Sequence, residues 1–289
     1  MTTTGPAEFF FRGNAVAAGG FLTRLGDKKL TLDPLTVTTH GESCLPWIGG
    51  ISHSIVENPQ LKVPQFISYG RCESYAEGRH EGDQTKTILR ANVRDIRLTT
   101  SPSPGDNVPD VKSMSFHADS ISVELQSTYS ETGLPYFKIK ATQPTGMALK
   151  VIDKSDRVKP LPVTLEFDED LLKLSTMKAV EDSFLGVREF FEEYTERFPS
   201  RHKLTFGTSQ IPRTPQGYVV LSFVRRIRVE GSPPINGNVL TRKGFGTIQF
   251  GLVLADTYNR RVTMARIKMG SDPGADVGFG GAETNGIWK

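Results

Sequence analysis

The feature that most constrains this chain is a period-two alternation of apolar and polar side chains. Residues 88–98 alternate in this way, and residues 136–141 and 246–255 follow the same rule. Such alternation is typical of antiparallel strands that cover a core with one face and leave the other face in solvent. The 28 glycines and 18 prolines supply many turn positions. We therefore predict a mainly β (α+β) fold built from antiparallel β-sandwich-like units.

One long amphipathic helix is expected at residues 175–198. Its apolar residues recur at steps of three and four, which places them on one stripe of a helix. Ser175 is a suitable N-cap, and Pro199 ends the helix because it has no N–H to donate. We expect the helix to pack on a sheet through this stripe, which comprises Met177, Val180, Phe184, Val187, Phe191, Tyr194 and Phe198.

A proline-rich stretch at residues 99–110 suggests a division of the chain. It holds three prolines in twelve residues, a composition typical of linkers. We therefore predict an N-terminal β subdomain at residues 1–105 and a second β subdomain at residues 110–289, which carries the helix.

Two hairpins are expected in the second half of the chain. One spans residues 121–141, and the other joins residues 246–255 to residues 261–269. Simple alternation would give the second hairpin an inner face of Ile248, Phe250, Leu252 and Leu254. The glycine-rich segment that follows, residues 270–289, is interpreted as a solvated tail.

The segment of residues 40–54 collects the side chains that nucleophilic catalysis uses. His40, Cys44 and His53 are weak catalytic candidates, with Ser43 as an alternative nucleophile. A Cys–His or Ser–His hydrolase needs a base within hydrogen-bond reach of the nucleophile and a third group that orients the base. Sequence proximity does not supply that geometry, so we interpret the segment as a polar loop packed under Trp47.

No motif for a metal or a cofactor is present in the sequence. The five histidines lack zinc-site spacing, and the acids of the C-terminal segment, Asp272, Asp276 and Glu283, do not match a calcium loop. A phosphate-binding glycine loop is also absent. We therefore expect no metal and no cofactor. The two cysteines, Cys44 and Cys72, are expected to be reduced.

Charge is segregated along the chain, although the net charge is only +3. Residues 166–196 hold ten acids against three bases, and residues 213–268 hold ten bases against two acids. Opposite poles suggest internal docking, association with another copy, or binding of an anion. The predicted interface residues are Arg225, Arg226, Arg228, Arg260, Arg261, Glu189, Glu192, Glu193 and Glu196.

These patterns favour a non-enzymatic structural or assembly protein that acts by self-association or protein–protein contacts. Its partner would be a second copy or another protein. One alternative is a β module that binds a polyanion or a carbohydrate, with the basic strands and Trp47 or Trp288 as contacts. A second alternative is the Cys/Ser–His hydrolase. Because neither a secretory signal nor an apolar run of about 20 residues is found, we expect a cytoplasmic protein that does not insert into membranes.

Overall fold

The computed structural model shows a protein made of β-strands. It describes residues 9–22, 24–25, 28–29, 35–61, 66–102, 106–131, 135–168, 219–255, 259–269, 275–284 and 286–288. These residues contain no helix, and the prediction of a mainly β, antiparallel fold is confirmed. The helix expected at residues 175–198 lies outside the described residues. No helix of sufficient length and apolarity to cross a membrane is found in the described part of the chain.

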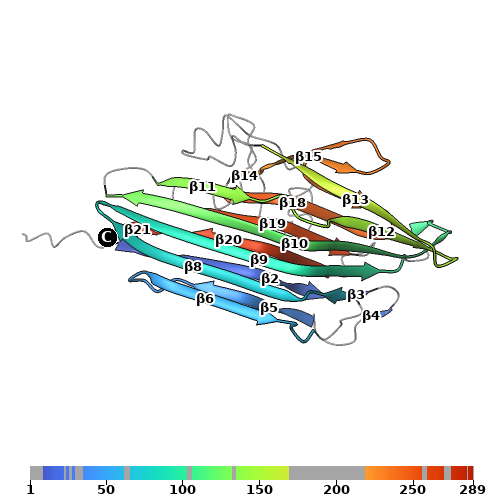
Figure 1. Ribbon diagram of the computed structural model, residues 1–289, viewed down its shortest axis with the longest axis horizontal. Coiled ribbons are helices and arrows are strands. Elements are labelled where there is room, and N and C mark those ends of the chain that lie inside the picture. The colour runs from blue at the N-terminus through green and yellow to red at the C-terminus, as the bar shows by residue number, and fades with distance from the viewer. Residues whose placement is uncertain are drawn as a thin grey trace, which may run out of the picture.

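The larger sheet has ten strands and forms the front layer in Figure 1. Its strands follow the order β16-β15-β13-β12-β10-β9-β8-β6, with β11 beside β10 and β7 beside β9. All neighbours are antiparallel. The strands are β6 (Gly50–Glu57), β7 (Ile67–Ser68), β8 (Arg71–Glu81), β9 (Gln84–Thr100), β10 (Val111–Ser130), β11 (Tyr136–Ala141), β12 (Ala148–Asp153), β13 (Val158–Phe167), β15 (Val224–Val229) and β16 (Ile235–Asn236).

The smaller sheet has seven strands and lies behind the first (Figure 1). Its order is β14-β18-β19-β20-β2-β5, with β17 beside β18, and its pairs are again antiparallel. The strands are β2 (Gly13–Leu22), β5 (Leu35–Cys44), β14 (Val219–Ser222), β17 (Val239–Arg242), β18 (Gly246–Ala255), β19 (Arg260–Met269) and β20 (Ala275–Thr284). Two short pairs complete the fold: β1 (Phe9–Phe10) with β21 (Ile287–Trp288), and β3 (Arg24–Leu25) with β4 (Lys28–Lys29).

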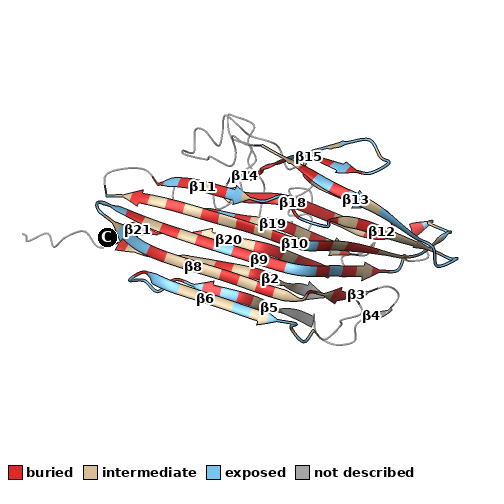
Figure 2. Ribbon diagram, in the orientation of Figure 1, coloured by how far each residue is buried: buried red, intermediate tan, exposed pale blue. Residues whose placement is uncertain are grey.

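The core lies between the two sheets. Buried residues alternate along β8, β9 and β10, as the red and tan bands of Figure 2 show. Aromatic rings meet across the layers: the centroids of Phe116 and Phe250 are 6.4 Å apart, and those of Tyr69 and Phe279 are 5.9 Å apart. Burial of such side chains is the main favourable term in folding, at about 25 cal/mol per Å² of apolar surface.

Strands from both predicted subdomains share both sheets. The stretch at residues 99–110 connects β9 to β10, and these two strands pair directly over most of their length. In the smaller sheet β2, near the start of the chain, pairs with β20, near its end. The two predicted units are therefore interleaved.

Both predicted hairpins are confirmed. β10 pairs with β11 from Val123↔Ala141 to Thr128↔Tyr136, and β18 pairs with β19 from Gly246↔Met269 to Ala255↔Arg260. The glycine-rich C-terminal segment, by contrast, was misread as a tail. Its residues 275–284 form β20, an interior strand of the smaller sheet, where Asp276 is buried and ion-paired to Arg266 at 2.5 Å.

A row of residues across the smaller sheet reverses the inward and outward alternation. The registers place Gly251, Met264, Gly280, Ala17 and Gly41 level with one another on β18, β19, β20, β2 and β5. The three glycines have φ angles of +62°, +64° and +61°, a region that other residues rarely adopt. On either side of this row, opposite members of the alternation are buried.

This reversal corrects the inner face predicted for β18. Ile248 and Phe250 are buried in the core as expected. Beyond Gly251, however, the residues in the central core cluster are Val253 and Ala255. Leu252 is buried outside this cluster, and Leu254 is only half-buried. The period of two is interrupted here because Gly251, at positive φ, exchanges the inward and outward positions of the residues that follow it.

We call Gly251, Gly280 and Gly41 the glycine row, and its effect on stability can be tested at Gly251. An added Cβ at Gly251 would lie 2.7 Å from Val224 Cγ2 and 3.0 Å from Phe223 Cε2, whereas Gly82 has a similar φ of +64° and open space around it. We expect Gly82→Ala to lower the free energy of unfolding by about 1 kcal/mol, the cost of positive φ alone. Gly251→Ala should cost about 1–3 kcal/mol more through overpacking. Chemical denaturation of both variants measures the difference, and equal losses would contradict it.

Candidate functional site at the edge of the larger sheet

Strand β6 is the outermost strand of the larger sheet and is exposed along its length. In the described part of the chain β6 pairs with β8 alone, so its other side is an open edge. Such an edge presents backbone N–H and C=O groups that can pair with another strand. Figure 2 draws β6 in pale blue and tan, without a buried residue. Within the described residues, the larger sheet therefore ends in a strand that pairs on one side only.

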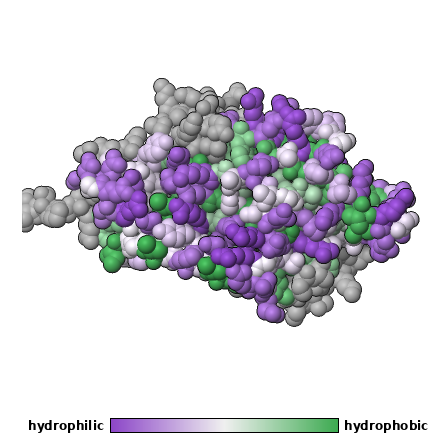
Figure 3. All heavy atoms as spheres, in the orientation of Figure 1, coloured by the Kyte–Doolittle hydropathy of each residue, from purple (hydrophilic) through white to green (hydrophobic). Residues whose placement is uncertain are grey.

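Apolar side chains gather on and beside this edge. Ile51 is 66% exposed and Ile55 is 46% exposed, and in the preceding turn Trp47 is 68% and Ile48 is 85% exposed. Figure 3 shows hydrophobic atoms along the margin of the molecule where β6 runs. Exposed large apolar side chains that cluster in this way mark interaction sites, whereas scattered ones need no explanation. We call Trp47, Ile48, Ile51 and Ile55 the edge patch.

The turn between β5 and β6 is built so that the edge patch points outward. Leu45 is buried and its N–H donates to the Gly13 carbonyl at 2.9 Å, while the Trp47 carbonyl accepts from Phe11 N–H at 2.9 Å. Gly49 has a φ of +84° and its N–H donates to the Pro46 carbonyl. These backbone bonds hold the turn against β1 and β2 and leave the Trp47 side chain in solvent.

Along β6 the side chains alternate between two environments. Ile51, His53, Ile55 and Glu57 are exposed on the outer face, whereas Ser52, Ser54 and Val56 are half-buried. Val56 packs against the core. This contact fixes which face of the strand is inward, because a shift by one residue would exchange the two sets.

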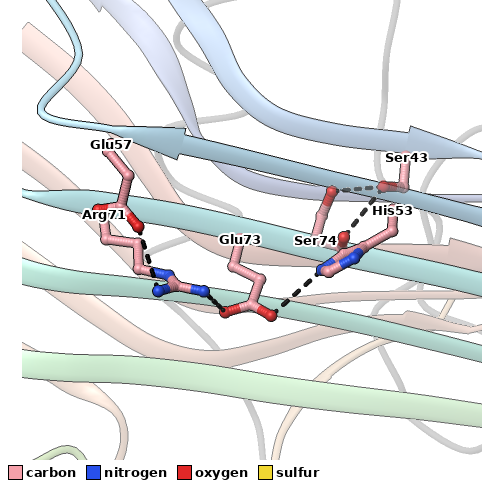
Figure 4. A network of polar contacts seen from close by, with 6 residues as sticks. All are labelled: Ser43, His53, Glu57, Arg71, Glu73 and Ser74. Atoms are coloured by element: carbon pink, nitrogen blue, oxygen red, sulfur yellow. Dashed lines mark hydrogen bonds and ion pairs between the residues drawn. The ribbon is translucent and has the colours of Figure 1, made fainter.

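The ionisable groups beside the edge form a connected network. In Figure 4 Arg71 bridges Glu57 and Glu73 with N–O distances of 3.1 and 3.0 Å, and Glu73 Oε1 lies 3.2 Å from His53 Nε2. Exposed pairs of this kind contribute about 0–1 kcal/mol each. Their larger effect is that Arg71 offsets part of the negative charge that Glu57 and Glu73 place beside β6.

A shallow groove of about 600 Å³ crosses the same outer face next to β6. Its lining includes Tyr75 and Arg90, whose guanidinium lies 5.2 Å from the ring centroid of Tyr75. Glu124 accepts from both Arg90 and Lys140. The remaining polar lining combines one further carboxylate with hydroxyl, amide and imidazole groups: Glu73, His53, Ser74, Asn92, Ser120, Ser122 and Thr142.

The structure does not bring the three catalytic candidates together. His40 Nδ1 lies 2.7 Å from the Tyr69 hydroxyl, His53 faces Glu73, and the nearest polar partner of Cys44 Sγ is Glu42 Oε1 at 3.7 Å. The alternative nucleophile Ser43 is buried, and its hydroxyl bonds to Ser74 Oγ at 2.7 Å. These pairings contain no nucleophile beside a histidine.

Electrostatics also works against a nucleophilic role for Cys44. Burial raises the pKa of the Cys44 thiol, and the charge and hydrogen bond of Glu42 raise it further. The reactive form is the thiolate, which a raised pKa disfavours. Burial also lowers the pKa of His40, which favours the neutral form of the imidazole beside Tyr69.

The predicted basic interface residues have different surroundings. Arg226 and Arg228 both pair with Glu166 on β13, with an N–O distance of 3.1 Å for Arg226. Arg261 is exposed and lies 4.0 Å from Glu283. Arg225 is exposed, and its side chain forms no ion pair with a described residue.

Arg260 was wrongly placed on the binding surface. It is 1% exposed, and its guanidinium stacks 4.2 Å from the ring centroid of Phe137. Alternation explains its position, because Arg260, Val262 and Met264 share the inward face of β19. The acidic candidates, Glu189, Glu192, Glu193 and Glu196, lie outside the described residues.

Sequence reasoning also missed the edge itself. Residues 40–54 were read as a loop packed under Trp47, yet they hold the end of β5, a turn and most of β6, and Trp47 is exposed. The usable signal was the alternation of Ile51, His53 and Ile55 with two serines, Ser52 and Ser54. No local pattern, however, tells which strand of a sheet lies at its edge.

Comparison with known proteins identifies the family but no activity. The chain belongs to a family described as a domain of unknown function, DUF8256, whose model matches residues 9–256. No curated protein and no solved structure matches the chain.

The thiol environments predict a distinct order of reactivity. Cys44 is exposed, so a small alkylating reagent reaches it, but its raised pKa should make it react more slowly at pH 7 than a free cysteine and faster as the pH rises. Glu42→Gln should accelerate the reaction, because it removes the carboxylate that opposes the thiolate. Burial raises the pKa of Cys72 to about 12, so this thiol should react only after unfolding.

Timed alkylation followed by mass spectrometry measures both rates. A Cys44 that reacts faster than free cysteine at pH 7 would contradict this account and restore the nucleophile hypothesis.

Proposed function

We propose that this member of the DUF8256 family is a non-enzymatic structural or assembly protein that self-associates through the open edge of its larger sheet. The observation that carries the proposal is the edge patch, in which four exposed apolar side chains lie on and beside a strand that pairs on one side only among the described residues. Strand addition at a sheet edge combines backbone hydrogen bonds with side-chain pockets. β6 offers backbone N–H and C=O groups along its open side and the exposed side chains of Ile51 and Ile55.

The edge lacks the features that usually block such pairing. Natural edge strands carry charges, prolines or bulges that prevent association. β6 contains no proline and no lysine, its register with β8 is continuous over eight pairs, and its one acid, Glu57, is paired to Arg71. An unprotected edge favours use as an interface.

The expected strength of this contact is modest. Burying an aliphatic side chain contributes about 1.5–3 kcal/mol when it passes from full exposure to full burial, and Ile51 and Ile55 are already partly covered. Each net hydrogen bond adds about 0.5–1.5 kcal/mol, against an association cost of at least about 4 kcal/mol. These magnitudes suit an assembly that depends on protein concentration.

A second candidate function is a carbohydrate-binding module. The groove on the outer face favours it, because hydroxyl and amide groups there could bond sugar hydroxyls beside the Tyr75 ring. Calorimetric titration with soluble glycans tests this candidate. Binding that Asn92→Ala abolishes and Val158→Ala retains would support it, and no heat with any glycan would exclude it.

Substitution of the edge patch tests the assembly proposal. Ile51→Lys should raise the dissociation constant of a symmetric dimer about 100-fold, because the lost burial occurs in both copies and every 1.4 kcal/mol is a factor of ten. Val158→Lys is the matched control, since Val158 is 55% exposed on another strand. Sedimentation velocity over a range of protein concentrations measures both.

Wild-type protein that stays monomeric at every protein and salt concentration would refute the proposal. Equal weakening by the Val158→Lys control would show that the contact does not involve the edge patch.

A further inference from the structure

The central residues of β6 read the same in both directions. Residues 51–55 are Ile-Ser-His-Ser-Ile, with the two isoleucines and the histidine on the exposed outer face and the two serines on the inner face. In a symmetric dimer the same patch meets itself, so residue i contacts residue j and j contacts i. A strand with a palindromic sequence is therefore complementary to an antiparallel copy of itself.

We propose that two copies of this chain pair antiparallel through β6, with the two-fold axis passing between their His53 residues. This inference rests on the proposed self-association and specifies its partner and register. Ile51 of one copy then lies opposite Ile55 of the second copy, and the reverse pair lies on the other side of the axis. The two ten-stranded sheets join into one continuous sheet, and all four isoleucines become cross-strand pairs.

Neighbouring registers pair the outward side chains of β6 less favourably. Moving the axis to Ser52 sets Ile51 against His53, and moving it to Ser54 sets Ile51 against Glu57. An axis between two residues places an outward isoleucine opposite an inward residue, because directly opposite residues share one face of an antiparallel pair. The His53 register alone among these matches apolar with apolar on both sides of the axis.

The charges near the junction are compatible with this arrangement. Glu57 is the one carboxylate on β6, which contains no lysine or arginine, and in the proposed register it faces Gly49 of the second copy. On the next strand Glu73 and Glu77 lie beside Ile55 and Ile51, and each is paired within its own copy, Glu73 to Arg71 at 3.0 Å and Glu77 to Arg79 at 2.8 Å. No two carboxylates are placed opposite each other.

The area of the contact indicates a weak dimer. Eight strand residues span about 27 Å and stacked sheets lie about 10 Å apart, so the edge covers on the order of 300 Å² per copy. Two copies bury on the order of 600 Å², below the ~1,200–2,000 Å² of stable complexes. We expect dimerisation in the micromolar range or weaker, which suits reversible assembly.

Cysteine cross-linking of the full chain tests the register. Cys44 is first replaced in Cys44→Ser, since it is exposed, whereas Cys72 is buried and stays unreactive. Opposite residues in an antiparallel pair have Cα atoms about 4.5–5.5 Å apart, within the 4.4–6.8 Å range of disulfides. His53→Cys should therefore form a covalent dimer with itself under mild oxidation.

Two further variants distinguish this register from its neighbours. Ile51→Cys and Ile55→Cys should each fail to cross-link alone, because a residue and its own symmetry copy lie about 14 Å apart along the strands. A mixture of the two should give a covalent heterodimer. Adding Ile55→Lys to His53→Cys should abolish the cross-link, while adding Val158→Lys should leave it unchanged.

The outcomes separate this inference from the function on which it rests. If light scattering shows dimers but Ile51→Cys cross-links to itself, or no pair cross-links, the register is wrong while self-association stands. If the Cys44→Ser protein is monomeric at every concentration, both fall.

Discussion

Two sheets packed face to face bury their inner surfaces, but neither can bury its own edges by that contact. In this protein the inner faces of β8, β9 and β10 meet those of β2, β19 and β20, and the core between them is continuous from Phe116 to Phe279. At one end of this sandwich β1, from the start of the chain, pairs with β21, from its end. Among the described residues, no strand pairs with the outer side of β6. The interface proposed here uses this edge of β6.

The same packing explains the glycine row. A wide, twisted sheet must stay in contact with its partner over its full length, and bends or bulges adjust its direction. Here Gly251, Gly280 and Gly41 reverse the pleat at one level across the smaller sheet. The consequence reaches beyond the backbone, because each reversal changes which side chains enter the core.

Ionic contacts have a different role in this molecule. The network of Arg71, Glu57, Glu73 and His53 lies on the surface, where such pairs contribute little to stability. Its effect is to offset part of the negative charge at the edge, where apolar side chains and backbone hydrogen-bonding groups are available to a second strand. Ion pairs within the molecule also join the acidic and basic segments of the sequence. Glu166 of the acidic segment pairs with Arg226 and Arg228 of the basic segment.

The sequence by itself determined the kind of secondary structure and several local pairings. Period-two alternation predicted strands, and turn residues predicted the hairpins of β10–β11 and β18–β19, because both signals act between residues close in the chain. Tertiary structure decided the rest. Arg260 is buried and β20 is an interior strand because of their neighbours in the sheet. β6 lies at an edge because no described strand pairs beyond it, and Ile51, His53 and Ile55 form a surface only there. Position in a sheet is a property of long-range pairing, so a local pattern cannot encode it.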